Sequence, residues 1–269
     1  MNKRWVKILI NVLKWSFLTA YIILTLSFVN NKNQQLICTS IDVNIKDSLE
    51  RAFVTKKDVL KLLEKKNDTP IGKPLWMINT HELEQRFMTQ HVIKKISIYK
   101  TANGALNVNI SQRKPMVRVI NKHNQSYYID SDGRLLPLSR NYTSHVLIMN
   151  GNISEPFEIA PNVRIMDLET NEDSIQPPLI YKLYELAKFI TDDPFWNAQI
   201  TQVYVGSPNN IELIPRVGSH TVLLGSTDDL ETKFAKLKLF YERGLPAEGW
   251  NKYKLINLKY KNQIVCTKR

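Results

Sequence analysis

Histidines and acidic pairs are the side chains in this sequence that would be most useful to an enzyme. The five histidines are far apart, and His81-Glu82 lacks the second histidine that would place two zinc ligands on one helical face. Two acidic pairs lie beside a turn and before a proline, where carboxylates usually cap or turn the backbone. Apart from these two acidic pairs, nothing in the sequence supports a pair of catalytic carboxylates like that of a glycosidase. The histidines are His81, His91, His123, His145 and His220, and the pairs are Asp130 with Asp132 and Asp192 with Asp193.

No catalytic motif gathers these side chains into a site. The sequence has no Gly-x-Ser-x-Gly elbow and no glycine-rich phosphate loop, and it contains only nine glycines in 269 residues. This absence of an acid–base or nucleophile constellation predicts that the protein is not an enzyme. We therefore expect no metal, no cofactor and no small-molecule substrate.

Composition indicates an ordinary folded protein with a basic surface. Apolar residues make up 43% of the chain and charged residues 23%. The formal net charge is +12, but lysine and arginine are spread along the chain without a long basic run, so we expect no nucleic-acid binding. Cys38 and Cys266 lie near opposite ends of the folded part, and their spacing permits a disulfide without indicating one.

An apolar segment at residues 8–29 predicts a membrane anchor. It has about the 20 residues that a helix needs to cross a bilayer, and its one charge, Lys14, is near enough to one end to reach the interface. Basic residues precede the segment and only Lys32 closely follows it, which predicts a cytoplasmic tail at residues 1–7 and export of the rest. The preceding basic residues are Lys3, Arg4 and Lys7.

Two other readings of the N-terminus compete with an anchor. A cleaved signal peptide would need a small-x-small cleavage site, which Ser27-Phe28-Val29-Asn30 does not offer. A lipoprotein acylated at Cys38 would need a small residue before the cysteine, and Ile37 is not small. An uncleaved single-pass anchor is therefore the favoured interpretation.

Residues 36–113 predict a small domain of three strands and two helices. Alternating apolar residues on both sides of Asn103-Gly104 indicate a β-hairpin within His91–Arg113. Upstream, Thr55 with Asp58 and Asn79 with Glu82 have capping-box spacing, so a helix begins at each pair. With a first strand at Ile41, Val43 and Ile45, the order is strand, helix, helix, strand, strand.

Residues 114–269 predict a second, mainly antiparallel β domain with two helices. Short alternating runs separated by turns indicate strands in a meandering sheet. One helix begins near Pro178 and ends at Asp193-Pro194, and the other ends at Gly244 and Pro246. The chain as a whole is therefore expected to be α+β, with the last strands at 255–260 and 263–267.

Several motifs in their order resemble the bacterial cell-division protein family FtsQ/DivIB, in which a POTRA domain precedes a C-terminal β domain. Gln112-Arg113-Lys114-Pro115 resembles the family's Glu-Arg-x-Pro step, with Gln112 in place of the acid. Ile256-Asn257-Leu258-Lys259-Tyr260 is similar to its Asp-Leu-Arg-Tyr segment, although Gln263 stands where glycine is usual. The other similar stretches are residues 91–98, 104–110, 128–133 and 222–225.

The resemblance implies a membrane-anchored, non-enzymatic scaffold of the division machinery. Its partners would be FtsB-like and FtsL-like proteins, and it would lie in the inner membrane at the septum with its C-terminus in the periplasm. In that family the partner adds a strand at the edge made by the C-terminal strands. By position, Lys259, Tyr260 and Asn262 are the implied partner-binding residues, although Tyr260 in an ordinary sheet-packing role is an alternative.

Two other functions are less well supported by the sequence. A POTRA-bearing envelope assembly or export factor would need repeated POTRA units or a membrane β-barrel, and this chain shows one unit and no barrel-like series of strands. An anchored cell-wall enzyme would need the catalytic constellation that the sequence lacks.

Overall fold

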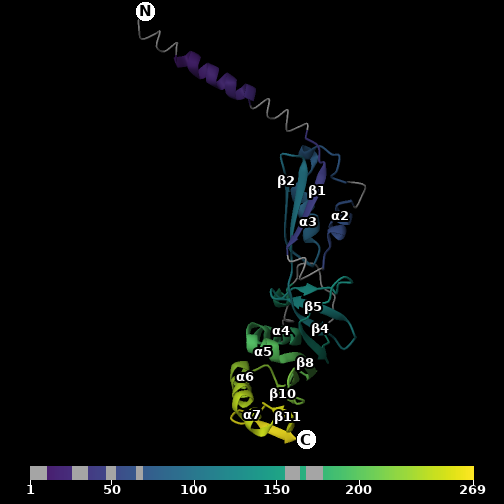
Figure 1. The fold of residues 1–269 in the computed structure, drawn as a ribbon, viewed down its shortest axis with the longest axis vertical. Coiled ribbons are helices and arrows are strands. Elements are labelled where there is room, and N and C mark those ends of the chain that lie inside the picture. Colours follow the sequence, from purple (N-terminus) through teal and green to yellow (C-terminus); the bar gives the residue numbers. More distant parts are fainter. Residues whose placement is uncertain (1–10, 26–35, 47–52, 65–68, 155–163, 168–177) are drawn as a thin grey trace, which may run out of the picture. The chain divides into compact units, whose positions relative to one another are not determined.

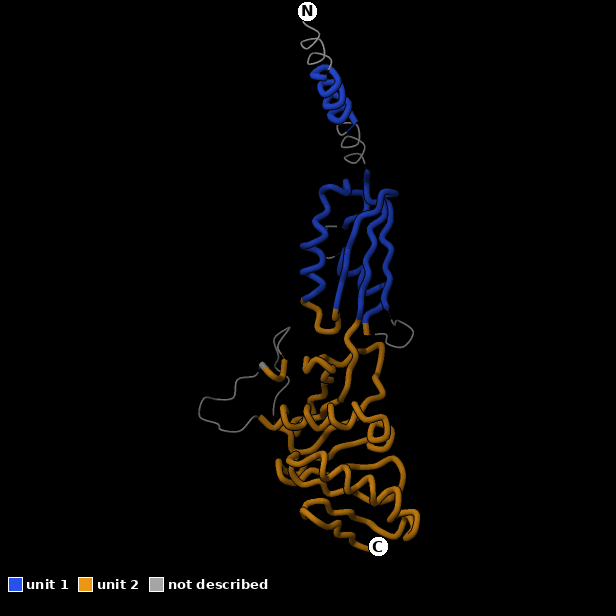
Figure 2. Tube along the Cα trace, turned by 90° about the vertical axis from the view of Figure 1, so that its left-hand side faces the viewer, with its two compact units in different colours: residues 1–48, 54–88, 95–111 blue, residues 49–53, 89–94, 112–269 orange. Residues whose placement is uncertain are grey.

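The computed structural model describes the chain except for residues 1–10, 26–35, 47–52, 65–68, 155–163 and 168–177 (Figure 1). It divides into two compact units, coloured separately in Figure 2. Residues 1–48, 54–88 and 95–111 form the first unit, and residues 49–53, 89–94 and 112–269 form the second.

Residues 11–25 form a helix within the segment expected to be an anchor. Both ends of that segment, residues 8–10 and 26–29, lie outside the described residues, as does the expected cytoplasmic tail. Within the described part of the chain, no helix is both long and apolar enough to cross a membrane.

The first unit contains a three-stranded sheet with the strand order β1-β3-β2. Strands β1 and β3 are parallel, with Val43 opposite Val108, and helices α2 and α3 supply the buried side chains Val59, Leu63, Leu83 and Phe87. The predicted order of strands and helices is confirmed. The elements are β1 (Ser40–Lys46), α2 (Lys56–Glu64), the 3-10 helix η1 (Leu75–Met77), α3 (Thr80–Met88), β2 (Ile93–Lys100) and β3 (Ala105–Gln112).

Both expected helix starts are capped as the sequence indicates. The N–H of Thr55 donates to Oδ2 of Asp58 at 3.0 Å, and the N–H of Asp58 donates back to Oγ1 of Thr55 at 3.3 Å. At the second helix, the N–H of Glu82 donates to Oδ1 of Asn79 at 3.2 Å. These caps satisfy backbone donors that a helix leaves unpaired at its first turn.

The β2–β3 turn requires glycine at position 104. Its φ is +87°, and a Cβ there would lie 2.8 Å from the carbonyl oxygen of Ile37. On the outer edge of β2, the N–H of Ile98 donates to Oε1 of Glu84 at 2.7 Å. Helix α3 therefore occupies a backbone donor that a strand-adding partner would need.

The second unit contains a nine-stranded sheet with the order β12-β11-β10-β9-β8-β7-β4-β5-β6. The predicted β-rich, α+β second domain is confirmed. Its strands are β4 (Pro115–Ile120), β5 (Ser126–Asp130), β6 (Leu135–Leu136), β7 (Leu147–Gly151), β8 (Ile200–Ser207), β9 (Asn210–Pro215), β10 (Thr221–Gly225), β11 (Tyr253–Asn257) and β12 (Val265–Lys268).

The sheet is not a simple meander. Strands β4 and β7, β7 and β8, and β10 and β11 pair in parallel, whereas the other neighbours are antiparallel. Parallel neighbours need a crossover, and helices supply two of these connections. Helices α4 (Leu179–Asp192) and α5 (Pro194–Gln199) precede β8, and α6 (Leu230–Leu239), the π-helix η3 (Phe240–Gly244) and α7 (Leu245–Glu248) precede β11.

One predicted helix end is confirmed and one is wrong. Helix α4 ends at Asp192, as Asp193-Pro194 indicated. A short helix that was not predicted begins there, because the Asp193 carboxylate caps α5 by accepting from the N–H groups of Phe195 and Trp196 at 2.8 and 3.3 Å. Gly244 and Pro246 do not stop the second helix, because proline is tolerated in the first turn of α7. The second unit also has a short 3-10 helix, η2 (Ile165–Asp167).

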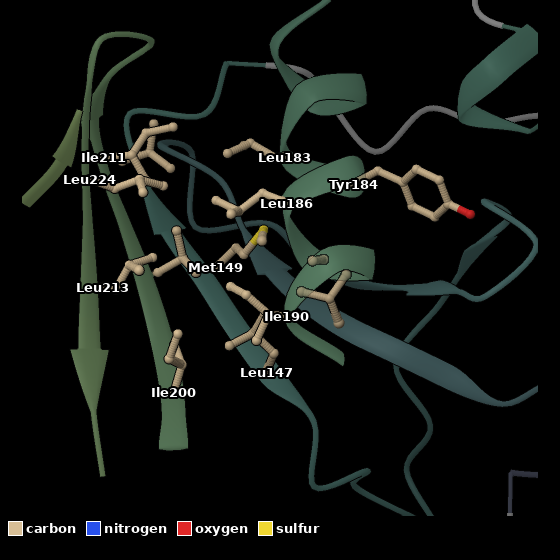
Figure 3. Close-up of a cluster of buried hydrophobic side chains, with 14 of the residues drawn as sticks. Leu147, Met149, Leu183, Tyr184, Leu186, Ile190, Ile200, Ile211, Leu213 and Leu224 are labelled. Atoms are coloured by element: carbon tan, nitrogen blue, oxygen red, sulfur yellow. The ribbon is translucent and has the colours of Figure 1, made fainter. Parts of the chain in front are cut away.

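Helix α4 packs on part of one face of the large sheet, as the close-up in Figure 3 shows. Leu183, Leu186 and Ile190 are fully buried and point toward the strands. Each such side chain contributes roughly 1.5–3 kcal/mol through removal of apolar surface from water. The strand residues that face them include Leu147, Met149, Ile200, Ile211, Leu213 and Leu224.

A buried ion pair lies at the start of the second unit. Nη1 of Arg113 lies 3.0 Å from Oδ2 of Asp130, and their side chains are 6% and 2% exposed. Oδ1 of Asp130 accepts from the N–H groups of Asp132 and Arg134 at 2.9 and 2.8 Å. Asp132 also lies 2.8 Å from Nζ of Lys94, and this contact holds the pKa of the Asp132 carboxyl below its usual value.

We expect Arg113→Met or Asp130→Asn to lower the free energy of unfolding of the second unit by about 3–5 kcal/mol. Arg113→Met leaves the buried Asp130 carboxylate without its counter-charge, and Asp130→Asn leaves buried Arg113 with only the longer contact to Asp132 at 3.5 Å. Chemical denaturation followed by near-ultraviolet circular dichroism measures the loss. Lys94→Met is the matched control, because Lys94 is half-exposed and its pair is worth about 1 kcal/mol or less. Equal losses in all three variants would show that the buried pair has no special role.

Candidate partner-binding edge of the C-terminal sheet

The last strand, β12, forms one edge of the nine-stranded sheet. It pairs with β11 in antiparallel register, with Asn257 opposite Val265 and Leu255 opposite Thr267. The N–H of Arg269 donates inward to the carbonyl of Lys252 at 3.2 Å. Since alternate residues of a strand direct their backbone groups to opposite sides, Cys266 and Lys268 direct theirs to the outer edge. Among the described residues, no strand pairs with that side.

The predicted site residues lie in the turn between β11 and β12. Strand β11 ends at Asn257, so the expectation of a strand through Tyr260 is wrong. The N–H of Lys259 donates to Oδ1 of Asn257 at 2.9 Å, and this local bond competes with the ladder and ends the strand. Tyr260 is 49% exposed, so it is not the ordinary sheet-packing residue of the alternative interpretation.

A lysine from α6 holds this turn in place. Nζ of Lys236 donates to the carbonyl oxygens of Tyr260 and Lys261 at 2.7 and 3.1 Å. The two contacts join Lys236 to residues 24 and 25 positions further along the chain, so no local sequence pattern indicated this role for Lys236. Lys236 is therefore a positioning residue that the motifs did not reveal.

The stem of Lys259 lies against Gly225 at the end of β10. Gly225 has φ +82°, and a Cβ there would lie 2.8 Å from Cγ of Lys259. The glycine thus permits both the backbone conformation and the close approach of the lysine stem. Gly225 is the last residue of β10, so its contact with Lys259 brings the Val222-Leu223-Leu224-Gly225 stretch next to the turn.

Asn262 lies on a shallow groove beside the turn, whereas Lys259 and Tyr260 do not line it. The groove has a volume of about 380 Å³ and lies between the turn and the α6–η3 helical segment. Its floor is apolar and its rim is basic. The lining residues are Lys236, Leu239, Phe240, Arg243, Gly244, Asn262, Gln263 and Ile264.

Nothing in this arrangement gathers acid–base or metal-binding groups. Within the described residues, no three histidine, cysteine, aspartate or glutamate side chains lie close enough to hold a metal ion. Cys38 and Cys266 are both free thiols, so the disulfide that their spacing permitted is not formed. The edge can offer backbone hydrogen bonds, an exposed tyrosine and positive charge, which are the chemistry of protein recognition.

Two family models match the chain. Residues 36–111 match a POTRA-like domain, and residues 114–267 match the model described as FtsQ/DivIB, C-terminal related, which covers more than half of the chain. The chain belongs to the FtsQ/DivIB C-terminal related family. The resemblance seen in the sequence is confirmed. These domains imply a role in cell division, and the FtsQ/DivIB family is non-enzymatic. A search of curated proteins gave no match.

In this FtsQ/DivIB-related chain, a buried histidine lies behind the candidate edge. Nε2 of His220 is 2.8 Å from the hydroxyl of Tyr241, and both side chains are buried. Burial lowers the pKa of His220, which the backbone of Trp250 offsets in part and the nearby Arg269 guanidinium reinforces. Burial also raises the pKa of Tyr241 far above its usual value, so neither group is charged at neutral pH.

We expect Lys236→Met to loosen the turn while leaving the sheet folded. The methionine keeps the apolar stem but removes the ammonium that binds the two carbonyls. Hydrogen exchange at the amides of residues 259–263 should quicken about tenfold, because local opening becomes easier. Lys188→Met, an exposed lysine on α4, is the control and should leave these rates unchanged. Unchanged rates in Lys236→Met would mean that the lysine does not hold the turn.

The buried histidine should make the second unit less stable in acid. The unfolded chain takes up a proton near pH 6.5, whereas folded His220 resists it, so the free energy of unfolding falls as pH drops below about 6.5. One such group contributes a slope of at most about 1.4 kcal/mol per pH unit.

Denaturant titrations at pH 7.5, 6.5 and 5.5 measure this slope. His220→Phe combined with Tyr241→Phe removes the titrating group without leaving a buried hydroxyl unpaired, and should flatten the slope. His123→Gln, which changes an exposed histidine, should not. A slope that survives in the double variant would assign the acid sensitivity to other groups.

Proposed function

We propose that the chain is a membrane-anchored scaffold of the bacterial division machinery that binds an FtsB-like partner at the β12 edge and, through it, an FtsL-like protein. Binding is its activity, without a catalytic step. The single observation that carries the proposal is the outer side of β12, where Cys266 and Lys268 direct backbone groups away from the sheet beside the exposed Tyr260. A partner strand would satisfy these groups and read the side chains around them.

The site supports a partner of defined chemistry. An extended partner segment can pair with β12, while Tyr260 supplies a large amphipathic contact surface at low entropic cost. Lys259 and Lys261 flank the tyrosine, so acidic side chains in the partner would complement the edge and speed association. Asn262 would contribute polar contacts at the adjoining groove.

The N-terminal segment supports anchoring in the inner membrane, with the C-terminus in the periplasm. The described helix at residues 11–25 exposes apolar side chains on all sides, and Lys14 is its one charged residue. A helix that is apolar all round belongs in a buried or lipid environment. Tethering at the septum would confine the scaffold and its partners to two dimensions and raise their effective concentration.

We expect Tyr260→Glu to weaken binding of the FtsB-like partner by tenfold or more, equivalent to about 1.4 kcal/mol, because it replaces an apolar contact by a charge. Lys259→Glu should act in the same direction. Co-purification and titration of the full chain in detergent measure the loss. Tyr204→Glu is the matched control, since Tyr204 on β8 is exposed to a similar degree, 42% against 49%.

The division role has an independent readout. Depletion of the protein should give filamentous cells with unsplit septa, and the Tyr260→Glu variant should fail to restore division. Unchanged partner recovery by the folded Tyr260→Glu and Lys259→Glu variants would reject this site. Normal division after depletion would reject the scaffold role itself.

A further inference from the structure

The first unit carries a cluster of exposed apolar side chains at one end. Ile37, Ile71, Trp76 and Met77 are 51%, 53%, 59% and 57% exposed, and we name these four residues the tip patch. Single exposed apolar residues are normal in folded proteins, but a group of four large ones marks an interaction surface. None of the four belongs to the partner edge described above.

Backbone hydrogen bonds join the two chain segments next to the tip-patch residues. The N–H of Leu75 donates to the carbonyl of Leu36, and the N–H of Cys38 donates to the carbonyl of Lys73, both at 2.8 Å. The N–H of Gly72 also donates to the carbonyl of Cys38 at 2.8 Å. Residues 36–38 and 72–75 are therefore paired segments, and the patch is built directly on the place where the chain enters the first unit.

The composition around the tip patch is that of a membrane interface. Residues 36–41 and 69–80 contain no acidic residue, and their one charge is Lys73. Tryptophan is enriched at the level of lipid headgroups, where its ring is amphipathic. A protein-binding surface would ordinarily place polar and charged groups of both signs around its apolar centre. These two segments supply no such mixed rim, although Met77 also lines a small groove that reaches Glu82 and Arg86.

The length of the tether brings this surface to the membrane. Six residues, 30–35, separate the end of the apolar N-terminal segment from Leu36. Even fully extended, six residues span only about 20 Å, which is less than the length of an eight-residue strand. The chain emerging from the bilayer thus cannot carry the tip patch far from the headgroups.

We propose that the tip patch rests on the outer surface of the membrane that holds the anchor, with Trp76 and its neighbours at headgroup depth. The occupant of this surface is lipid, not a protein. The inference rests on the proposed anchor, and it adds a second contact that orients the first unit. A unit held at two points samples fewer orientations than one held by a flexible tether alone.

Depth-dependent quenching in proteoliposomes tests the proposal on the full chain. One variant carries a nitrobenzoxadiazole label on Ile71→Cys. The comparison variant carries it on Lys95→Cys, near the end of β2 that is far from the hairpin turn. Both variants also contain Cys266→Ser. Cys38 is 1% exposed and stays unlabelled. Nitroxide lipids should quench the label at position 71 at least threefold more strongly than the label at position 95.

Variants of the patch supply the second arm. Adding Trp76→Glu with Met77→Glu should reduce quenching at position 71 to the level seen at position 95, while thermal unfolding reports that the unit remains folded. Equal quenching at the two positions, or quenching at 71 that survives the double substitution, would overturn the proposal. Efficient capture of a protein by a photo-crosslinker at position 76 would also overturn it.

Failure of the anchor is distinguishable from failure of the tip patch. If alkaline carbonate extracts the chain from the vesicles, the anchor is wrong and the proposed function must be revised. If the chain resists extraction but the label at position 71 is not quenched, the anchor holds and only the tip-patch inference fails.

Discussion

The buried pair between Arg113 and Asp130 is the constraint on which the second unit depends. Burial of two charges is costly, and it is tolerated here because the remaining carboxylate oxygen accepts two backbone N–H groups. Arg113 lies two residues before β4 and Asp130 is the last residue of β5, where Pro115 lies opposite Asp130. With this register set, β4 presents its other side to β7, and each later strand adds to the one before until β12. The ion pair thus lies near one end of the sheet, and the proposed binding edge is at the other.

The sheets differ in how their edges are finished. In the small sheet, Glu84 occupies the Ile98 N–H on the outer edge of β2. In the large sheet, one end is β6, which has only two residues, and the other is the four-residue strand β12. A short edge limits unwanted pairing, whereas β12 has the adjoining turn, held by Lys236, to add selectivity. The proposed recognition site therefore lies at one end of the large sheet.

Local sequence signals predicted most of the first unit, because its determinants lie within a few residues of each other. Thr55 with Asp58 and Asn103-Gly104 identified a helix start and a turn without any knowledge of the fold. The second unit depends on long-range pairing, and no pattern near β4, β7 or β10 indicates a parallel neighbour. Asp193-Pro194 ends α4 as predicted, but α5 was missed because an acid before a proline is as good a start for a helix as an end.

Resemblance located Lys259, Tyr260 and Asn262, but it did not indicate their conformation. Asn257 ends the strand through its own side chain, and Lys236 reaches the turn from a distant helix. Neither contact follows from spacing. Likewise, Arg113 and Asp130 were recognised as parts of two separate motifs, and only the fold places them in one ion pair.

An unfilled strand edge also carries a hazard, because two copies of the chain can pair through it before the proper partner arrives. The backbone groups that could pair with a partner strand would then pair with a second copy and start aggregation. Lys268 on β12 and Arg269 oppose this outcome, since charged side chains on an edge strand disfavour pairing, and parallel in-register pairing of two copies would place their cations side by side. Positive charge at this edge thus disfavours self-assembly. Newly made copies are most prone to aggregate while a strand that could pair with β12 is scarce.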